Sequence, residues 1–215
     1  MHGRRWKQLW RKYRMKDTAL IVFQKKPEKG QVKTRLAQTI GDEKAVEVYR
    51  YLLDHTHRQL ALLQIPVFVY FDNAIDRDFL LQENYSVAVQ KGKDLGEKMK
   101  TALKEVFSAS HQKVFLLGSD CPGLETCIIQ EAIESLKSND LVIGPAKDGG
   151  YYLIGMKKPH DALFENKSWS TSTVLADTLR EAQILGLTVS LLKELSDVDV
   201  YEDLSDGLKQ RFNIR

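Results

Sequence analysis

Short apolar runs alternate with longer amphipathic segments along almost the whole chain, and this alternation constrains the fold more than any other feature. The runs typical of strands are Ala19–Phe23, Val67–Phe71, Ser86–Gln90, Val114–Leu117, Leu141–Ile143, Tyr151–Met156 and Thr188–Leu192. The segments with helical spacing are Asp42–Leu63, Asp76–Leu81, Leu95–Phe107, Thr126–Leu136, Thr173–Leu185 and Tyr201–Phe212. Strands that alternate with helices favour a mostly parallel sheet covered on both faces. The sequence therefore predicts an α/β fold, a Rossmann-like three-layer sandwich.

The chain has room for one sizeable core, since it has 215 residues of which 43% are hydrophobic. We expect a single domain over residues 17–215. Residues 1–16 form a separate basic extension in which apolar side chains recur at helical spacing, at Trp6, Leu9, Trp10 and Tyr13. An amphipathic helix on an anionic membrane or a partner is one interpretation of that extension, and a disordered arm or an upstream start is the simpler one.

The distribution of charge argues against nucleic acid as a partner. The extension 1–16 carries seven basic residues and no acid, so the rest of a chain with net charge +3 has a net charge of −4. Binding to a phosphate backbone needs a basic face. Cys121 and Cys127 fit neither a redox pair nor a zinc site, and no apolar run approaches the ~18 residues that a membrane span needs. We expect reduced thiols and a cytoplasmic location.

The segment Gln24–Leu36 has the composition of a phosphate-binding loop. It reads QKKPEKGQVKTRL and follows the first apolar run directly, so it should lie at the carboxyl edge of the first strand, where α/β proteins bind ligands. Lys33 and Arg35 are one residue apart, and in an extended loop both would reach one polyphosphate, Arg35 as a bidentate fork and Lys33 as a point charge. A solvated loop without a ligand is the alternative.

Carboxylates follow two further apolar runs and predict a site for Mg²⁺ or Mn²⁺. Asp120 comes after Val114–Leu117, and Asp197 and Asp199 come after the last run. Alternate residues of an extended segment point to one side, so Asp197 and Asp199 could face the same ion as Asp120. Such an ion usually takes one or two carboxylates, while water and phosphates complete its shell. The alternative for Asp197 and Asp199 is N-capping of the helix that begins at Tyr201.

The junction that contains Gln90 and Gly96 is a candidate nucleotide contact. Its sequence is QKGKDLG, between a predicted strand and a predicted helix. The carboxamide of Gln90 can read a base edge, and Gly96 permits close approach of the backbone.

The candidate acceptor site lies on two later turns. Asp148, Gly149, Gly150 and Tyr151 combine an acid, two glycines and an aromatic ring, which suits a substrate pocket. The alternative is a tight hairpin with Tyr151 or Tyr152 in the core. Ser170, in the sequence Trp-Ser-Thr-Ser-Thr, offers a hydroxyl at a helix start, where an anion site and plain N-capping are equally good interpretations.

Taken in order, these motifs resemble one family. The motifs are KxPxxGxVKTRLA, QxGxDLG, LLGSDCPGL, GPAKDGGYYLIG, WST and DVDxxEDL. The chain from Ala19 to Leu204 resembles the radical-SAM/selenodomain-associated transferases of the GT-A nucleotide-diphospho-sugar transferase superfamily. It is also similar to 2-phospholactate guanylyltransferases. The resemblance implies that Asp120 and Asp199, with Asp197, hold the metal, that Lys33 and Arg35 bind phosphates, that Gln90 lies at the base, and that the Asp148-Gly149-Gly150 turn and Ser170 line the acceptor site.

Three functions follow as hypotheses. The first is metal-dependent nucleotidyl transfer from a nucleoside triphosphate to a small phosphorylated acceptor, with Asp120, Lys33 and Arg35 as catalytic residues. The second is glycosyl transfer from a nucleotide-sugar to a small-molecule acceptor, with Asp148 as the base. The third is a non-catalytic nucleotide-binding protein. The base, the acceptor and the oligomeric state stay open.

Overall fold

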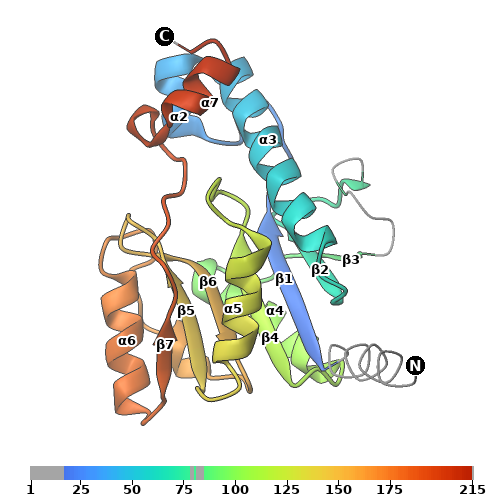
Figure 1. The fold of residues 1–215 in the computed structure, drawn as a ribbon, viewed down its shortest axis with the longest axis vertical. Coiled ribbons are helices and arrows are strands. Elements are labelled where there is room, and N and C mark those ends of the chain that lie inside the picture. The colour runs from blue at the N-terminus through green and yellow to red at the C-terminus, as the bar shows by residue number, and fades with distance from the viewer. Residues whose placement is uncertain (1–16, 78–79, 81–84, 215) are drawn as a thin grey trace, which may run out of the picture.

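A computed structural model of the chain describes residues 17–77, 80 and 85–214. The predicted extension 1–16 lies outside the described residues, as does half of the predicted helix Asp76–Leu81. Seven strands form one sheet in the order β3-β2-β1-β4-β6-β5-β7 (Figure 1). Their bounds are β1 Thr18–Gln24, β2 Val67–Phe71, β3 Ser86–Val89, β4 Lys113–Gly118, β5 Leu141–Pro145, β6 Tyr151–Met156 and β7 Val189–Leu191.

The sheet is mostly parallel, as the alternation of strands and helices predicted. Strand β6 alone runs against its neighbours, pairing antiparallel with β4 and β5, whereas the other four strand pairs are parallel. The turn before β6 is therefore a hairpin turn that returns the chain into the sheet between β4 and β5. Because of this reversal, β6 begins at the edge of the sheet where the parallel strands end.

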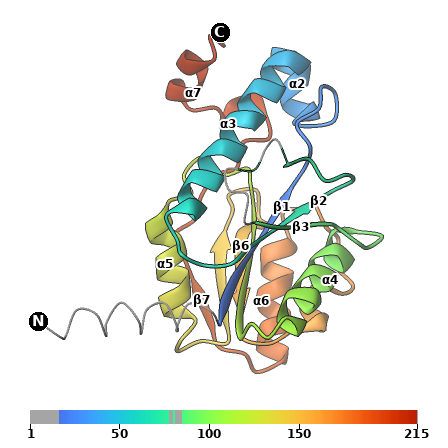
Figure 2. The same ribbon diagram turned by 90° about the vertical axis from the view of Figure 1, so that its right-hand side faces the viewer.

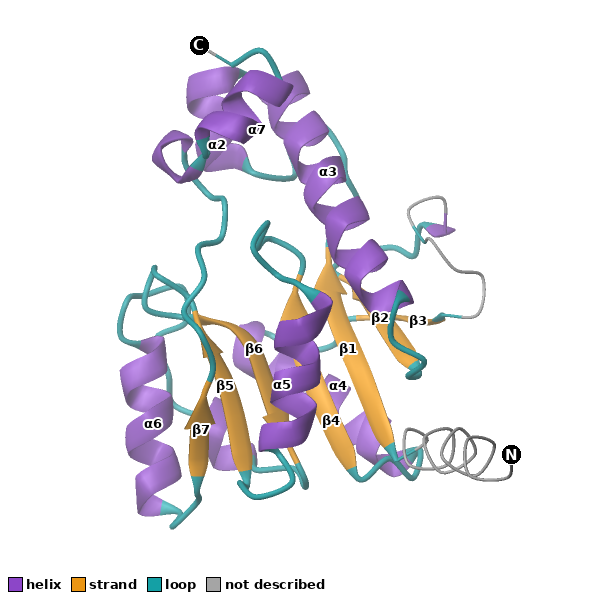
Figure 3. Ribbon diagram, in the orientation of Figure 1, coloured by secondary structure: helices purple, strands orange, loops and turns teal. Residues whose placement is uncertain are grey.

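Helices cover both faces of the sheet. They are α2 Thr34–Ile40, α3 Asp42–Ala61, α4 Leu95–Ser108, α5 Thr126–Ser135, α6 Val174–Ile184 and α7 Asp206–Arg211, with the short 3-10 helices η2 Asp161–Phe164 and η3 Tyr201–Asp203. One hydrophobic cluster joins α3 and α5 to the sheet, and another joins α4, η2 and α6 to the opposite face. Figures 2 and 3 show the three layers, and the predicted sandwich is confirmed.

Strand β1 lies at the centre of this core because its side chains are apolar on both faces. Ala19 to Val22 are fully buried. Leu20 and Val22 pack toward α3 and α5, whereas Ala19 and Ile21 pack toward α4. Such unbroken apolar runs are typical of central parallel strands.

A smaller helical lobe lies beyond the carboxyl ends of the parallel strands (Figure 1). It contains α2, the start of α3, and α7, which share a cluster of buried residues: Leu36, Val48, Leu52, Val198, Leu204 and Leu208. The prediction of a single helix over Tyr201–Phe212 was wrong. Ser205 divides it into η3 and α7, because its side chain accepts the amide of Leu208 and caps a new helix.

The loop Gln24–Leu36 also differs from its predicted form. Helix α2 begins at Thr34, so Arg35 lies on a helix and not in an extended loop. Elsewhere, no helix in the described part of the chain is both long enough and apolar enough to cross a bilayer.

Candidate active site

A cavity of about 290 Å³ opens at the edge of the sheet where β1 and β4 end and β6 begins. Its walls come from these strands, from α4 and α6, and from the segment that follows β7. This edge is the usual ligand site of an open α/β sheet. The cavity is therefore the natural place to look for the predicted site residues.

Four carboxylates line the cavity. Asp120 follows β4, Asp148 lies in the hairpin turn between β5 and β6, and Asp197 and Asp199 come from the segment after β7. Val198, between the last two, is fully buried, and its amide donates to the carbonyl of Asp120 at 3.1 Å. This backbone bond holds the two late acids beside the end of β4, although they come much later in the sequence.

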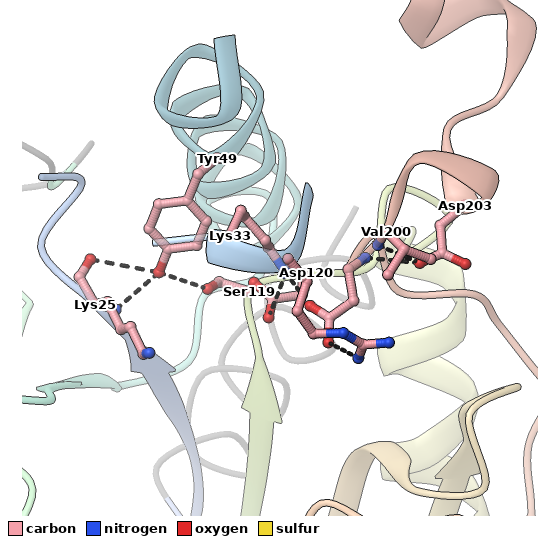
Figure 4. A network of polar contacts seen from close by, with 9 residues as sticks. Lys25, Lys33, Tyr49, Ser119, Asp120, Val200 and Asp203 are labelled. Carbon is pink, nitrogen blue, oxygen red and sulfur yellow. Dashed lines mark hydrogen bonds and ion pairs between the residues drawn. The ribbon is translucent and has the colours of Figure 1, made fainter. Parts of the chain in front are cut away.

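The side chain of Lys33 is held between two of these acids (Figure 4). Its Nζ lies 2.9 Å from Oδ2 of Asp120 and 2.9 Å from Oδ1 of Asp199, and the side chain is only 4% exposed. Lys33 has φ 48°, a left-handed conformation that is uncommon for a residue with a side chain. The backbone at the start of α2 thus adopts an unfavourable conformation where this ammonium group meets the two carboxylates.

The charges shift one another's protonation. Burial lowers the pKa of Lys33, but Asp120 and Asp199 outweigh burial and raise it above its usual range. Burial raises the pKa of Asp199, but Lys33 outweighs burial and lowers it. Lys33 compensates Asp197 less: burial, with Asp148 and Asp199 nearby, outweighs it and raises the pKa of Asp197 to about 6. The site thus contains a compensated pair and a less compensated acid.

A second group of contacts ties the loop after β1 to α3 (Figure 4). The hydroxyl of Tyr49 accepts from the amide of Lys25 at 2.8 Å and lies 3.5 Å from Oγ of Ser119. Burial raises the pKa of the Tyr49 hydroxyl, so this group stays neutral. These contacts fix the loop that leads to Lys33 against the residue that precedes Asp120.

Arg35 is the more accessible of the two predicted phosphate ligands. Its side chain is 68% exposed, lines the cavity, and places Nη1 3.7 Å from Oδ2 of Asp199. Two other cations of the loop are engaged on the surface, since Lys26 pairs with Glu28 and Lys29 with Glu43, each at 2.7 Å. Arg35 is the only cation among the described residues that line the cavity.

The predicted nucleotide contacts Gln90 and Gly96 lie outside the cavity lining. Nε2 of Gln90 donates to the carbonyl of Tyr70 at 3.0 Å, next to the end of β2. Gly96 permits the close approach to its backbone that its residue type predicted, and the groups that approach it belong to the protein itself. A Cβ atom there would lie 2.4 Å from the carbonyl oxygen of Phe164 and 2.5 Å from Nε1 of Trp169.

The hairpin turn serves both the cavity and the core. Gly150 and Tyr151 line the cavity, and the amide of Gly150 donates to Oδ1 of Asp148 at 2.8 Å. Gly149 has φ 89° and packs against Ser172, where a side chain would clash with backbone. Tyr152 is 5% exposed, and its hydroxyl donates to the carbonyl of Lys193. Both interpretations of this turn, a pocket and a hairpin, therefore describe part of it.

The loop before α6 brings Ser170 to the cavity with φ 62°. The neighbouring Thr171 also lines it, although its hydroxyl already donates to the carbonyl of Ser168 at 2.7 Å. No side-chain capping bond holds the start of α6. In the C-terminal segment, the capping role that was the alternative for Asp197 and Asp199 belongs to Asp203, which accepts the amides of Asp199 and Val200.

Sequence reasoning missed the apolar part of the cavity. Three partly buried rings from different elements line it, those of Phe23, Tyr151 and Trp169, together with Leu95 and Met99 of α4. Phe23 and Leu95 read as ordinary apolar positions of a strand and a helix. Only their place at the end of β1 and the start of α4 could have indicated a ligand wall.

The acids fit a hard divalent cation in their chemistry. Carboxylate oxygens are the ligands that Mg²⁺ and Mn²⁺ prefer, and one or two of them are enough where a substrate supplies phosphate oxygens. Within the described ranges, no three acids, histidines or cysteines come close enough to hold an ion by themselves. Asp120 and Asp199 are the two candidates, each now paired with Lys33.

Comparison with known proteins gives a family and a fold. The family model described as "Uncharacterized protein conserved in bacteria (DUF2064)" matches residues 55–171. A crystal structure from Desulfovibrio desulfuricans G20, described as a candidate nucleotide-diphospho-sugar transferase, is 30% identical in sequence. The alignment covers 91% of each chain with a TM-score of 0.82. No curated protein matches the chain.

More distant structures share the fold alone. The inositol-1-phosphate CTP transferase of T. maritima is 15% identical, with a TM-score of 0.59 over 93% of this chain and 96% of that one. The 4-diphosphocytidyl-2C-methyl-D-erythritol synthase of Anaerococcus prevotii is 14% identical, with a TM-score of 0.58 over 87% and 94%. The architecture is thus that of nucleotidyltransferases and nucleotide-sugar transferases.

Proposed function

Because the chain belongs to the family described as uncharacterized proteins conserved in bacteria (DUF2064), and its fold is that of nucleotide-dependent transferases, we propose that it transfers a group from a nucleotide donor to a small acceptor. One observation carries the proposal. Lys33 and Arg35 meet Asp120 and Asp199 at the mouth of a cavity, at the carboxyl edge of the sheet.

The donor's phosphates would bind at this mouth. Lys33 and Arg35 supply a point charge and a planar fork for phosphate oxygens. Asp120 and Asp199, with Asp197 beside them, would hold Mg²⁺ or Mn²⁺, which when bound neutralises charge on the phosphates. Nζ of Lys33 now lies 2.9 Å from both Asp120 and Asp199. When one of these carboxylates holds the metal, Lys33 would contact a phosphate oxygen in its place.

Glycosyl transfer is the version that the cavity favours. Asp148 lines the cavity and takes no part in the proposed metal and phosphate contacts, so it is free to act as a base. A hydroxyl acceptor needs such a base, whereas a phosphate dianion has no proton to give up and would be repelled by this carboxylate. In this version the acceptor oxygen bonds to the anomeric carbon of a nucleotide-sugar. The bond from that carbon to the phosphate oxygen breaks, and the nucleoside diphosphate leaves with the electron pair. Asp148 takes the hydroxyl proton as general base.

Nucleotidyl transfer is the second candidate, and the pair Lys33 and Arg35 favours it. In this version a phosphorylated acceptor attacks the α-phosphorus of a nucleoside triphosphate in line, and pyrophosphate leaves. Lys33 and Arg35 would stabilise the charge on the departing pyrophosphate. The cation-rich loop suggested this reaction from the sequence, but Lys26 and Lys29 are taken up by surface ion pairs.

Thermal-shift measurements test the proposal directly. Purified protein would be heated with ATP, GTP, CTP, UTP, UDP-sugars or GDP-sugars, each with and without Mg²⁺ or Mn²⁺. We expect a metal-dependent rise in Tm with a nucleotide-sugar. A rise with a triphosphate alone would favour nucleotidyl transfer, and no rise with any of them would refute the nucleotide donor.

Asp120→Asn separates an enzyme from a nucleotide-binding protein without turnover. Loss of one carboxylate should abolish the metal-dependent part of the shift and lower turnover of the donor by orders of magnitude. The matched control is Asp54→Asn. Asp54 is exposed to the same degree, 39% against 40%, and pairs with Arg58 on α3, away from the cavity. If both variants bind and turn over the donor like the parent protein, Asp120 has no role in the chemistry.

A further inference from the structure

The cavity has two sides with different chemistry. The α2 side carries the charged residues Lys33 and Arg35 with their acids. The α4 side carries what we call the aromatic wall, formed by the rings of Phe23, Tyr151 and Trp169. These rings belong to the same hydrophobic cluster as α4 and α6, and each is only partly buried, so apolar surface faces the cavity.

The aromatic wall continues onto helix α4. Leu95, the first residue of α4, is 40% exposed although it lines the cavity, and Met99 lies one turn further on. The hydroxyl of Tyr151 points at Sδ of Met99, 4.0 Å away, and burial raises its pKa, so this hydroxyl stays neutral. A ligand that bound here would thus meet mainly carbon, because Met99 is buried and the Tyr151 hydroxyl is turned toward it and away from the cavity.

Trp169 is held in place by a close backbone contact. Gly96 lies so near that a Cβ atom would come within 2.5 Å of Nε1 of the indole and 2.4 Å of the Phe164 carbonyl oxygen. The indole therefore packs on the first turn of α4, where only glycine leaves room. A ring fixed in this way presents the same surface to every ligand, which lowers the entropy cost of binding.

Charge around the wall excludes one class of ligand. Asp148 and Asp197 line the same cavity as the wall, and Asp148 lies in the hairpin turn that leads into Tyr151. Arg35 is the single cation in the described lining, and it lies at Asp199. A phosphate beside the wall would face carboxylates without a matching cation, whereas a neutral or cationic group would not.

The size of the cavity limits what the wall can hold. A volume of about 290 Å³ is at the lower end for ligand pockets, which run from about 300 to 1,000 Å³. This volume leaves room for a ring-sized group in addition to the phosphates of a donor. With the donor's phosphates at Lys33 and Arg35, the group on the wall is the acceptor.

We propose that the aromatic wall binds the acceptor of the transfer, and that this acceptor is an uncharged or cationic alcohol with a ring or another apolar face, not a phosphate ester. This inference rests on the proposed function. It adds the chemical class of the acceptor and assigns Trp169, Phe23 and Tyr151 as the residues that select it. Apolar contact and ring stacking provide the attraction, and the acids reject phosphorylated competitors.

Tryptophan fluorescence tests this proposal without any donor. The chain has three tryptophans, so replacing Trp6 and Trp10 by Phe leaves Trp169 as the sole reporter in the full-length protein. This protein would be titrated with three probes: benzyl alcohol, methyl β-glucoside and benzyl phosphate. We expect saturable changes in Trp169 emission with benzyl alcohol or with the glucoside, and binding of benzyl phosphate at least tenfold weaker than that of benzyl alcohol.

Tyr151→Leu in the same background removes one ring of the wall and should weaken the binding of benzyl alcohol at least threefold. Tyr51→Leu is the matched control, because Tyr51 packs with His55 and Phe212 and lies outside the cavity lining. Circular dichroism would confirm that both variants fold. An unfolded Tyr151→Leu protein would be replaced by Tyr151→Phe, for which binding of benzyl alcohol should stay unchanged because the ring is kept.

Three results would overturn the proposal. The first is benzyl phosphate that binds as tightly as benzyl alcohol. The second is a free nucleoside that binds to Trp169 more tightly than either uncharged probe, because the wall would then be a base pocket. If the probes bind as expected but no nucleotide raises Tm, the proposed function fails and the chemistry of the wall stands. The third is a protein to which no probe binds although nucleotides raise Tm. The proposed function would then stand, and the aromatic wall would not be the acceptor site.

Discussion

Replacing Lys33 by Met should lower the free energy of unfolding by about 2 kcal/mol. The change keeps an apolar stem of similar length but removes the ammonium that lies 2.9 Å from both Asp120 and Asp199. Hydrogen bonds to charged groups contribute about 1.5–3 kcal/mol each. The full sum is not expected, because the two carboxylates are 40% and 43% exposed and regain water, and because the buried ammonium no longer has to be desolvated.

Urea unfolding at neutral pH measures this difference, with Lys29→Met as the control on the same loop. Lys29 pairs with Glu43 at 2.7 Å, but both side chains are more than 60% exposed, so we expect no resolvable change in the free energy of unfolding. In an Asp199→Asn background the cost of Lys33→Met should fall by about 1 kcal/mol, which is the coupling of two residues in contact. Equal effects of Lys33→Met and Lys29→Met would refute the buried position of this ammonium.

Two further predictions concern the framework of the site. His57 is 1% exposed, its Nε2 lies 2.7 Å from Oε1 of Gln24, and burial lowers its pKa to about 4. The unfolded chain therefore binds the extra proton between pH 6.5 and 4, so about 3 kcal/mol of stability should be lost as pH falls through that window. The free energy of unfolding of His57→Gln, measured in urea, should not fall in this way between pH 6.5 and 4. A variant whose stability falls with pH in parallel with that of the parent protein would contradict the prediction. Gly96→Ala should cost about 1–3 kcal/mol and shift Trp169 emission in the sole-tryptophan protein, because backbone cannot yield to the new Cβ. Gly118→Ala, with open space at its Cβ, should be within about 0.5 kcal/mol of the parent protein in the same assay.

The strands were predictable because each is a short apolar run with turn residues at its ends. The position and direction of β6 were not. Tyr151–Met156 reads as a strand, but nothing in its own residues says that it lies between β4 and β5 and runs against both. That placement depends on pairing between residues far apart in the sequence. The local signal was the Asp148-Gly149-Gly150 turn, which fits a hairpin as well as a pocket.

Helix α2 and the split of the last helix show a second limit. Lys33 adopts a left-handed conformation that favours glycine, so no propensity marks it as the start of a helix. Its conformation is maintained by contacts that only the folded chain provides, namely two carboxylates from distant segments. Ser205 was the recognisable case, since serine is a common N-cap. A strained residue at a site is where local rules are expected to fail.

The sequence Asp197-Val198-Asp199 shows why part of the site could be predicted from the residues alone. In an extended segment neighbouring side chains point to opposite sides, so one buried apolar residue fixes the direction of both its neighbours. Val198 is fully buried in the cluster with Leu36 and Leu204, and its amide is bonded to Asp120. Asp197 and Asp199 must then face the cavity. The same residue joins the helical lobe to the edge of the sheet, so the packing of that lobe and the position of two acids depend on one another. What the sequence could not reveal is that Lys33 already lies between Asp120 and Asp199, because that contact requires α2, the end of β4 and the C-terminal segment to meet.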